Sequence, residues 1–275
     1  MKLLGISRCT VCSPGREGAD SALFRGVADR LAAMGHRVDT VAEGDFAGWA
    51  GSYDGVFQMA RKASAIAMLS TLEIPVVNTP QSVMNCYRTT QDQLFHESGV
   101  QVPRSRVCKT LAGPGDWNLW PCWLKKGGSH SEIQSDVTMV HSPAECAVQM
   151  AQMAARGIEE CLVQEHVPGA LVKIYGVTGN WVLDCCAVGG EPDKFGRSVP
   201  GQAGIDVTQL KKNDALREVV GKAALAVGTD VFGADVIVSP DGTFSIIDFN
   251  DWPSFGSCRD RAVCAIADLL VKKFG

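Results

Sequence analysis

Two aspartates and an asparagine flank the last turn signal of the chain, and together they could hold a divalent cation. Asp241 and Gly242 separate two apolar, β-prone segments, which is the strongest short signal of a β-hairpin. A two-residue loop there predicts that Asp235 lies opposite Asp248, with β-carbons roughly 5 Å apart, and that Asn250 shares their face. Facing carboxylates repel unless a cation lies between them, and oxygen ligands suit Mg²⁺ or Mn²⁺ rather than zinc. Solvated acids at a sheet end are the alternative, which the apolar neighbours of Asp248 disfavour.

Two lysines lie within apolar, strand-like segments, where a cation is unusual. They are Lys125 in Pro-Cys-Trp-Leu-Lys and Lys173 in Leu-Val-Lys-Ile-Tyr. A strand lysine is ordinarily a surface residue whose aliphatic stem covers apolar neighbours. Lys125, however, precedes the small, polar segment 127–131, whose amides could fold over phosphate oxygens. Because a metal held by few carboxylates commonly binds substrate phosphates, both patterns suggest a phosphate ligand, although the chain has neither a Walker loop nor a GxGxxG motif.

The first eighty residues alternate between strand and helix patterns. Short apolar runs at 3–7, 38–41, 55–59 and 74–77 predict strands. A helix is predicted after the first run, because apolar residues recur at helical spacing from Leu23 to Leu31 and Gly35 follows as a C-terminal signal. A second helix is predicted at 63–72. This alternation favours a parallel sheet in an open α/β lobe.

The pattern changes after residue 80 to one of antiparallel strands with fewer helices. Ser142, Pro143 and Glu145 form a capping box with proline at the first helical position, so they predict the start of a helix. The remaining helices are expected near 89–98, 214–227 and 259–274, and the remaining strands near 106–108, 123–125, 161–165, 172–177 and 181–185, besides the final hairpin. These α+β segments must position both lysines and the acidic hairpin.

Composition and charge exclude several classes of protein. The chain has 275 residues, 46% of them hydrophobic and 20% charged, which is typical of a folded globular enzyme and not of a disordered tail. A net charge of -4 and the lack of a basic run argue against nucleic acid as a partner, and no apolar run approaches a membrane span. We expect a cytoplasmic protein. The pair Cys9 and Cys12 has no second pair to complete a zinc site, which favours reduced, mostly buried cysteines.

Five motifs in order resemble the ATP-grasp superfamily over most of the chain. Residues 77–80, Arg88 and residues 99–103 resemble the entry to the nucleotide-binding lobe of that superfamily. Arg88 stands at the position of its first phosphate-binding lysine. Lys125 is similar to the second such lysine, and 127–131 to the glycine-rich lid. Residues 163–167 are similar to the strand and hinge whose backbone holds adenine, and Asp235 with 248–250 to the metal-binding acid, acid and asparagine.

The resemblance implies a fold and a set of site residues. An N-terminal Rossmann-like α/β lobe at 1–80 would precede two ATP-gripping α+β lobes, at 81–165 and at 166–275 with the metal hairpin. Arg88, Lys125 and Lys173 would be catalytic and would neutralise charge on the transferred phosphoryl group. The residues expected to bind ATP are Arg88, Lys125, Gly127, Gly128, Ser129, Gln164, Glu165, His166, Val167 and Lys173, and those expected to bind Mg²⁺ or Mn²⁺ are Asp235, Asp248 and Asn250.

The activity implied is that of a carboxylate–amine ligase of the glutamate-ligase and glutathione-synthetase type, acting through an acyl phosphate on a small molecule or peptide. The alternative is a small-molecule kinase, because Asp248 stands where the commonest ligases carry Glu and so resembles the ATP-grasp inositol polyphosphate kinases. A kinase would benefit from a base, for which His130 and His166 are candidates. A non-catalytic nucleotide-binding protein would be expected to have lost the metal ligands, and all three are present.

Four basic residues are candidates for substrate contacts. The arginine usual on the strand after residue 180 is missing from 182–188, so Lys194 and Arg197 are candidates to replace it. Arg16 and Arg259 are further candidates for substrate binding. The expected partner is a small-molecule or peptide substrate, with a homodimer as a further alternative. Neither nucleic acid nor membrane is expected as a partner.

Overall fold

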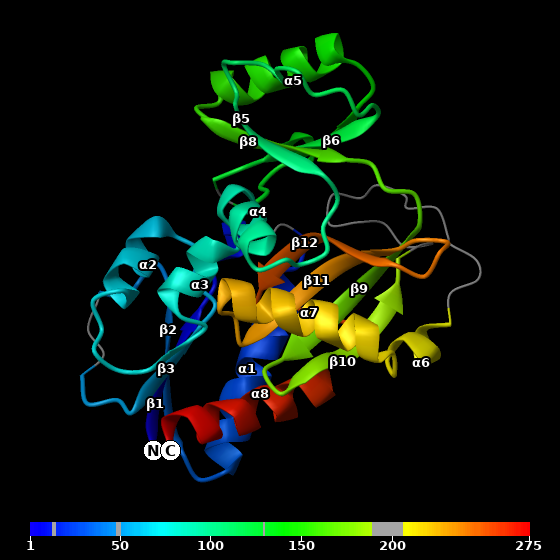
Figure 1. Cartoon of the computed structure of the whole chain (residues 1–275). Coiled ribbons are helices and arrows are strands. Elements are labelled where there is room, and N and C mark those ends of the chain that lie inside the picture. The colour runs from blue at the N-terminus through cyan, green and yellow to red at the C-terminus, as the bar shows by residue number, and fades with distance from the viewer. Residues whose placement is uncertain (13–14, 48–50, 129, 189–205) are drawn as a thin grey trace.

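Three four-stranded sheets form the protein, seen in a computed structural model whose described residues are 1–12, 15–47, 51–128, 130–188 and 206–275 (Figure 1). The N-terminal sheet has the order β2-β1-β3-β4, and every neighbouring pair in it is parallel. Its strands are β1 (Lys2–Ser7), β2 (Arg37–Ala42), β3 (Gly55–Gln58) and β4 (Val76–Val77). The parallel α/β arrangement predicted for this part of the chain is therefore confirmed.

Helices cover both faces of the N-terminal sheet. Successive residues of a strand point to opposite faces, so Leu3 joins a core with α1 (Glu17–Ala33) and α8 (Arg259–Phe274), while Leu4 packs with α2 (Ala63–Leu69). The last helix of the chain thus returns to pack beside the first one, as Figure 1 shows. A further short helix, α3 (Pro80–Asn85), begins at the Thr79 side chain, which accepts a hydrogen bond from Ser82 N.

The central sheet is antiparallel and has the order β5-β8-β6-β7. The strands are β5 (Ser105–Lys109), β6 (Cys122–Lys126), β7 (Val137–Val140) and β8 (Glu160–Glu165). Helix α5 (Pro143–Ala155) covers the outer face of this sheet and begins at the predicted cap, where the Ser142 side chain accepts from Glu145 N. Helix α4 (Arg88–Glu97) lies between this sheet and the rest of the molecule (Figure 1).

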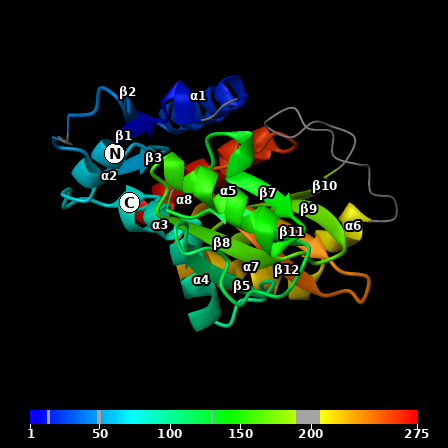
Figure 2. The ribbon, with the colours of Figure 1, turned by 90° about the horizontal axis from the view of Figure 1, so that it is seen from above.

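The C-terminal sheet is also antiparallel, in the order β10-β9-β11-β12. Its strands are β9 (Ala170–Val177), β10 (Asn180–Ala187), β11 (Val231–Val238) and β12 (Phe244–Asp251). Helices α6 (Val207–Leu210) and α7 (Asp214–Val227) cover one face, and α7 ends at the left-handed Gly228. Figures 1 and 2 together show the central sheet above the C-terminal sheet, so that β12, β6 and β8 face one region.

The final hairpin forms, but the two-residue loop predicted for it is wrong. Ser239 N donates to Thr243 O, and Val238 pairs with Phe244, so the loop is one residue longer than the pattern at Asp241 and Gly242 predicts. A bulge then shifts the register between Asp235 and Val236. The two deviations cancel, and Asp235 does lie opposite Asp248 as predicted.

Smaller differences from the sequence-based prediction concern short elements. Helix α2 ends at Leu69 and not near residue 72, and the pattern predicted neither α3 nor β7. Two 3₁₀ turns, Thr10–Cys12 and Gln134–Asp136, complete the described secondary structure. Over the described ranges, the structure contains no helix that is both long enough and apolar enough to span a membrane.

Candidate active site

Arg88 joins helix α4 to the acidic hairpin. It is the first residue of α4 and is nearly buried, and its Nε and Nη2 lie 3.2 Å from Asp248 Oδ1 and Oδ2 respectively. The opposite edge of the guanidinium turns toward the loop after β6, where Nη1 donates to Lys126 O at 3.3 Å and to Ser131 Oγ at 3.0 Å. Arg88 therefore fixes both the acid and the loop in one planar contact.

Lys125 lies beside this pair, on β6 of the central sheet. Its Nζ donates to Gln164 Oε1 at 2.7 Å and to the Ile247 carbonyl at 2.6 Å. Ile247 has no partner in the register of β11, because it is the extra residue of the bulge. The bulge thus supplies the carbonyl that ties the two sheets together at the ammonium group.

A second ion pair stands next to the first on the C-terminal sheet. Lys173 Nζ lies 2.8 Å from Asp235 Oδ1, and Lys173 is the register partner of Asp235 on β9. Asp248 faces Asp235 from β12, and Asn250 Nδ2 donates to Asp248 Oδ2 at 3.1 Å, which leaves the Asn250 carbonyl oxygen as an acceptor. The predicted residues Asp235, Asp248 and Asn250 are therefore brought together.

This donor set fits a hard divalent cation. It consists of oxygens, and the Asp235 and Asp248 side chains keep 26% and 21% of their surface exposed, so an ion and its waters could reach them. Mg²⁺ commonly binds through one or two carboxylates and keeps several waters. Oxygen donors of this kind suit Mg²⁺ or Mn²⁺ better than zinc.

The charged groups shift one another's titration. Burial alone would raise the pKa of Asp248, but Arg88 and Lys125 outweigh it and hold that pKa well below its usual range. Burial lowers the pKa of Lys125 to about 8, against the pull of Asp248. Asp235 raises the pKa of Lys173 above its ordinary value. Near neutral pH the site therefore contains charged lysines and an ionised Asp248.

The two glycines after β6 differ in the space that surrounds them. A Cβ on Gly127 would lie 2.6 Å from Thr89 Cγ2 and 2.7 Å from Glu160 O, whereas nothing lies within 4 Å of one on Gly128. Only glycine fits at the first position because the backbone of β8 is that close. The predicted ligand Ser129 lies outside the described residues.

The predicted hinge lies at the end of β8 and in the segment that follows it. Gln164 is buried against Lys125, and a small pocket opens between α4, β8 and β12, lined by Arg88, Gln164 and Ile247 among others. Glu165 N donates to Arg104 O. Trp123 Nε1 donates to His166 Nδ1 at 3.3 Å, and Val167 follows His166 in the chain. Trp123 shares a face of β6 with Lys125, so His166 packs on the face that carries this lysine.

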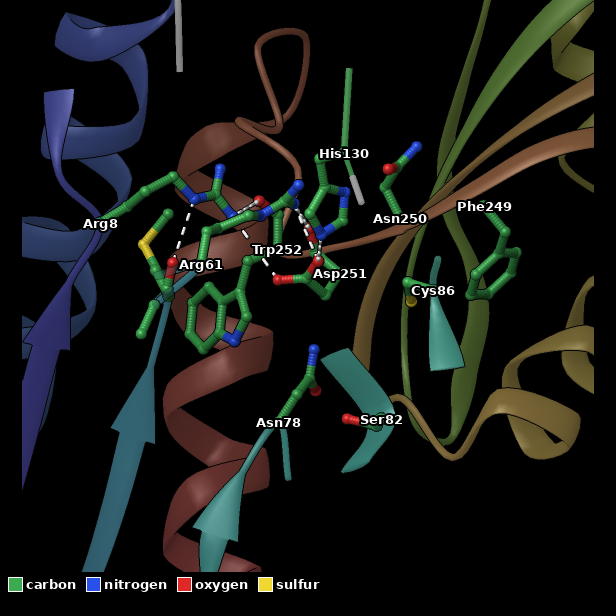
Figure 3. Close-up of polar contacts among 12 residues, drawn as sticks. Arg8, Arg61, Asn78, Ser82, Cys86, His130, Phe249, Asn250, Asp251 and Trp252 are labelled. Atoms are coloured by element: carbon green, nitrogen blue, oxygen red, sulfur yellow. Dashed lines mark hydrogen bonds and ion pairs between the residues drawn. The ribbon is translucent and has the colours of Figure 1, made fainter. Parts of the chain in front are cut away.

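A second charged cluster, centred on Asp251, connects the hairpin to the N-terminal sheet (Figure 3). Asp251 is fully buried, and its Oδ1 lies 2.8 Å from Arg61 Nη2 and 3.6 Å from His130 Nε2. Arg8 Nη2 lies 3.6 Å from Asp251 Oδ2, while Arg8 Nη1 is 2.8 Å from Asp20. His130 belongs to the segment after β6, so this cluster draws on all three sheets.

The two arginines of this cluster follow adjacent strands. Arg8 comes directly after β1 and Arg61 shortly after β3, where the strand order reverses, and ligands bind at such carboxyl ends in open α/β sheets. Sequence analysis missed Arg61 and Asp251 and gave His130 only as a candidate base. The available signal was the position of both arginines immediately after predicted neighbouring strands.

The structure describes two of the four predicted substrate residues, Arg16 and Arg259, at the starts of α1 and α8, which pack against each other. Arg16 is exposed and precedes α1, and Arg259 begins α8 with its buried Nε lacking a hydrogen-bond partner. Lys194 and Arg197 lie outside the described residues. Asn78, which the motif at 77–80 contains, instead binds backbone: its side chain donates to Val231 O and accepts from Asp230 N and Val231 N.

Comparison with known proteins gives structural matches only. No protein-family model matches the chain, and no curated protein matches its sequence. The structure resembles an ATP-grasp RimK domain protein from Sphaerobacter thermophilus, with a TM-score of 0.68 and 16% identity over 98% of this chain and 100% of that one.

Two further structures agree along nearly the whole chain. The D-alanine–D-alanine ligase from Bacillus anthracis in complex with ATP has a TM-score of 0.68 and 12% identity over 100% of both chains. The ATP-grasp ligase PsnB in complex with a minimal precursor has a TM-score of 0.67 and 17% identity over 98% of both chains. This chain has the ATP-grasp fold. The predicted N-terminal α/β part and the two α+β parts of that fold are therefore confirmed.

Proposed function

We propose that this ATP-grasp protein is an ATP-dependent, Mg²⁺-requiring ligase that joins a carboxylate to an amine through an acyl phosphate. The observation that carries this proposal is the convergence of Arg88, Lys125 and Asp248 where the central and C-terminal sheets face each other. The fold comparisons support it, because the similar structures include ligases, one of them in complex with ATP.

The nucleotide would lie between the central and C-terminal sheets, in the region of Lys125, Gln164 and Gly128. In this proposal the residues expected from the resemblance keep their roles: Glu165, His166 and Val167 would lie beside the adenine, and Ser129 is still expected to contribute to phosphate binding. The open space around Gly128 leaves room for phosphate oxygens beside the backbone. We also propose that the chain divides into three lobes, at 1–80, 81–165 and 166–275. Helix α8, from the third lobe, packs against α1 of the first lobe.

Arg88, Lys125 and Lys173 would neutralise negative charge as the γ-phosphoryl group moves to the substrate carboxylate. Asp235, Asp248 and Asn250 would hold Mg²⁺, which supplies further positive charge at the phosphate oxygens when bound. Arg88 and Lys125 are already fixed by buried hydrogen bonds, so little reorganisation is needed when charge develops. The amine would then displace phosphate from the acyl phosphate, and no protein nucleophile is required.

The acceptor would enter beside the N-terminal sheet, where Arg61 and His130 surround Asp251 next to the metal hairpin. A small molecule or a peptide is the proposed substrate class, and the PsnB complex with a precursor supports a peptide.

Mass spectrometry of a metabolite and peptide pool incubated with the protein, ATP and Mg²⁺ tests the reaction type. Hydroxylamine captures acyl phosphates, so hydroxamates formed at the expense of ATP are the expected result. A phosphorylated product that hydroxylamine does not change would instead establish the kinase alternative.

A variant pair checks that the turnover belongs to this site. Asp248→Asn keeps the shape of the side chain but removes a charge from the metal site and is expected to abolish Mg²⁺-dependent turnover. Asp241→Asn, in the exposed loop of the same hairpin, is the matched control and should retain it. Equal loss in both variants would contradict the assignment.

A further inference from the structure

Two cysteines lie in contact at the carboxyl end of β1. Cys12 is the last residue of the short 3₁₀ turn Thr10–Cys12 after the strand, and Cys9 directly precedes that turn. The Sγ atoms of the two cysteines are 2.7 Å apart. Both side chains are partly exposed, whereas most of the other cysteines are buried as single thiols. All eleven cysteines of the chain are free in this structure. The pair is separate from the nucleotide region proposed above.

Glu43 fixes the backbone around the pair. Its Oε1 accepts from Cys9 N at 2.6 Å, and its Oε2 accepts from Arg61 N and Lys62 N at 2.7 and 2.8 Å. One buried carboxylate therefore holds the segments after β1 and β3 in place. Cys9 is presented on an anchored backbone, and its approach to Cys12 does not depend on a freely moving loop.

A bound metal and a disulfide are the two chemical outcomes for such a pair. The sulfur and oxygen atoms of Cys9, Cys12 and Glu43 lie within 4.8 Å of one another. Two thiolates on one tetrahedral zinc would, however, stand about 3.8 Å apart, given Zn–S bonds of about 2.3 Å. The observed 2.7 Å is nearer to the ~2.05 Å of a disulfide, and both Glu43 oxygens already accept backbone hydrogen bonds.

We propose that Cys9 and Cys12 form a reversible dithiol–disulfide site that reacts with small-molecule disulfides. In the first step, one cysteine thiolate attacks the reagent, forming a mixed disulfide and releasing one reagent thiol. The second cysteine then attacks the protein sulfur of that mixed disulfide and releases the other reagent thiol. Two electrons pass from the cysteine pair to the reagent, and the two thiol protons end on the two released thiols.

The position of the pair gives it a defined place in the molecule. Cys9 follows Arg8 directly, and Arg8 donates to Met59 O and Trp252 O and forms ion pairs with Asp20 and Asp251. Burial, the Cys9 thiol and Glu43 raise the pKa of Cys12 to about 12. Cys12 is therefore an uncharged thiol near neutral pH, and it reacts only through its small thiolate fraction.

Tryptic mass spectrometry tests the proposal on the full chain. Cleavage after Arg8 and Arg16 places both cysteines on the peptide 9–16. The protein is equilibrated without oxygen in glutathione buffers of increasing oxidised fraction, and remaining thiols are blocked with iodoacetamide. We expect peptide 9–16 to become unalkylated and two hydrogens lighter in oxidising buffers, and to return to the doubly alkylated form with dithiothreitol.

Two controls make the result specific. Cys264 is exposed and lies alone on the peptide 262–272, so it should show only alkylation or a glutathione adduct. Cys9→Ser should abolish the loss of two hydrogens and leave Cys12 alkylated or glutathione-bound. Neither residue belongs to the proposed nucleotide or metal site, so this test succeeds or fails independently of ligase activity.

Three results would overturn the proposal. Both thiols of peptide 9–16 could stay alkylated in buffers that modify Cys264, or each could carry glutathione instead of joining the other. One equivalent of zinc could also remain on the reduced protein through gel filtration, prevent disulfide formation and be lost in Cys9→Ser. That last result would assign a metal site in place of the disulfide.

Discussion

Removing the Asp251 carboxylate should destabilise the protein strongly, because the group is the buried counter-ion of Arg61. Asp251 is fully buried, and the Arg61 side chain keeps only 11% of its surface exposed. Burial and the nearby Arg8 lower the pKa of Arg61, and Asp251 opposes them. In Asp251→Ala, a buried guanidinium would lose its charged partner and keep only its hydrogen bond to the backbone carbonyl of residue 251.

The magnitude follows from the number of charges left without a partner. Removing one member of a buried ion pair costs roughly 3–5 kcal/mol. Arg8 would keep Asp20 at 2.8 Å, so Arg61 is the arginine left without an ion-pair partner, while His130 loses a longer contact of 3.6 Å. We therefore expect the lower end, about 3 kcal/mol in the free energy of unfolding. Urea denaturation followed by circular dichroism measures this difference.

Two further variants separate the buried ion pair from other effects. Asp116→Ala removes a carboxylate that pairs with Arg106 on the surface, and it should leave the urea midpoint unchanged because exposed pairs contribute little. The double variant with Arg61→Met and Asp251→Leu removes both charges and should recover most of the stability. A loss in Asp251→Ala as small as that in Asp116→Ala would refute the reasoning.

Three further predictions concern the proposed nucleotide site. Gly127→Ala should lower the unfolding free energy by about 1–3 kcal/mol, because its Cβ would meet the β8 backbone, whereas Gly128→Ala should have no effect on thermal unfolding. The pKa of Lys125 is about 8 because of burial, so Mg-ATP affinity should fall as pH rises above 8, by up to ~tenfold per unit. Calorimetry between pH 6.5 and 9.5 measures this, and Lys125→Met should bind weakly with a flat pH profile. Lys173→Met should slow turnover more than it weakens nucleotide binding, since Lys173 contacts Asp235. Steady-state kinetics and a nucleotide-binding assay measure the two effects. A larger loss of binding than of turnover would show that Lys173 only binds nucleotide.

The hairpin shows which features of the proposed metal site local patterns could predict. Alternation along a strand places Asp248 and Asn250 on one face, and the sequence was enough to predict that. Asp235 faces Asp248, however, only because a longer loop and a bulge cancel each other. The turn type was predicted wrongly, because Asp241 also binds the Thr243 amide and hydroxyl and so favours a longer loop. The bulge at Ile247 compensates for the longer loop. The Ile247 carbonyl accepts a hydrogen bond from Lys125 of the central sheet, and no local pattern specifies that contact.

The cluster around Asp251 could not be predicted in the same way. Asp251 pairs with Arg61 across 190 positions of the chain, and no local pattern specifies that contact. Neighbouring parallel strands do place Arg8 and Arg61 at one edge of the sheet, and that much was available from the sequence. The position of β12 against that edge depends on the packing of three sheets, which hydrophobic periodicity does not specify.

Charge balance gives a physical reason for the metal site as part of the proposed mechanism. Without ligands, the site places Arg88, Lys125 and Lys173 near Asp235 and Asp248, which leaves one excess positive charge. A triphosphate brings several negative charges, so the protein's cations alone would leave it undercompensated in a partly buried site. A divalent cation on Asp235, Asp248 and Asn250 corrects most of that deficit at the phosphate oxygens themselves. Nucleotide binding should therefore depend steeply on Mg²⁺ in the wild-type protein, and Asp248→Asn should flatten that dependence.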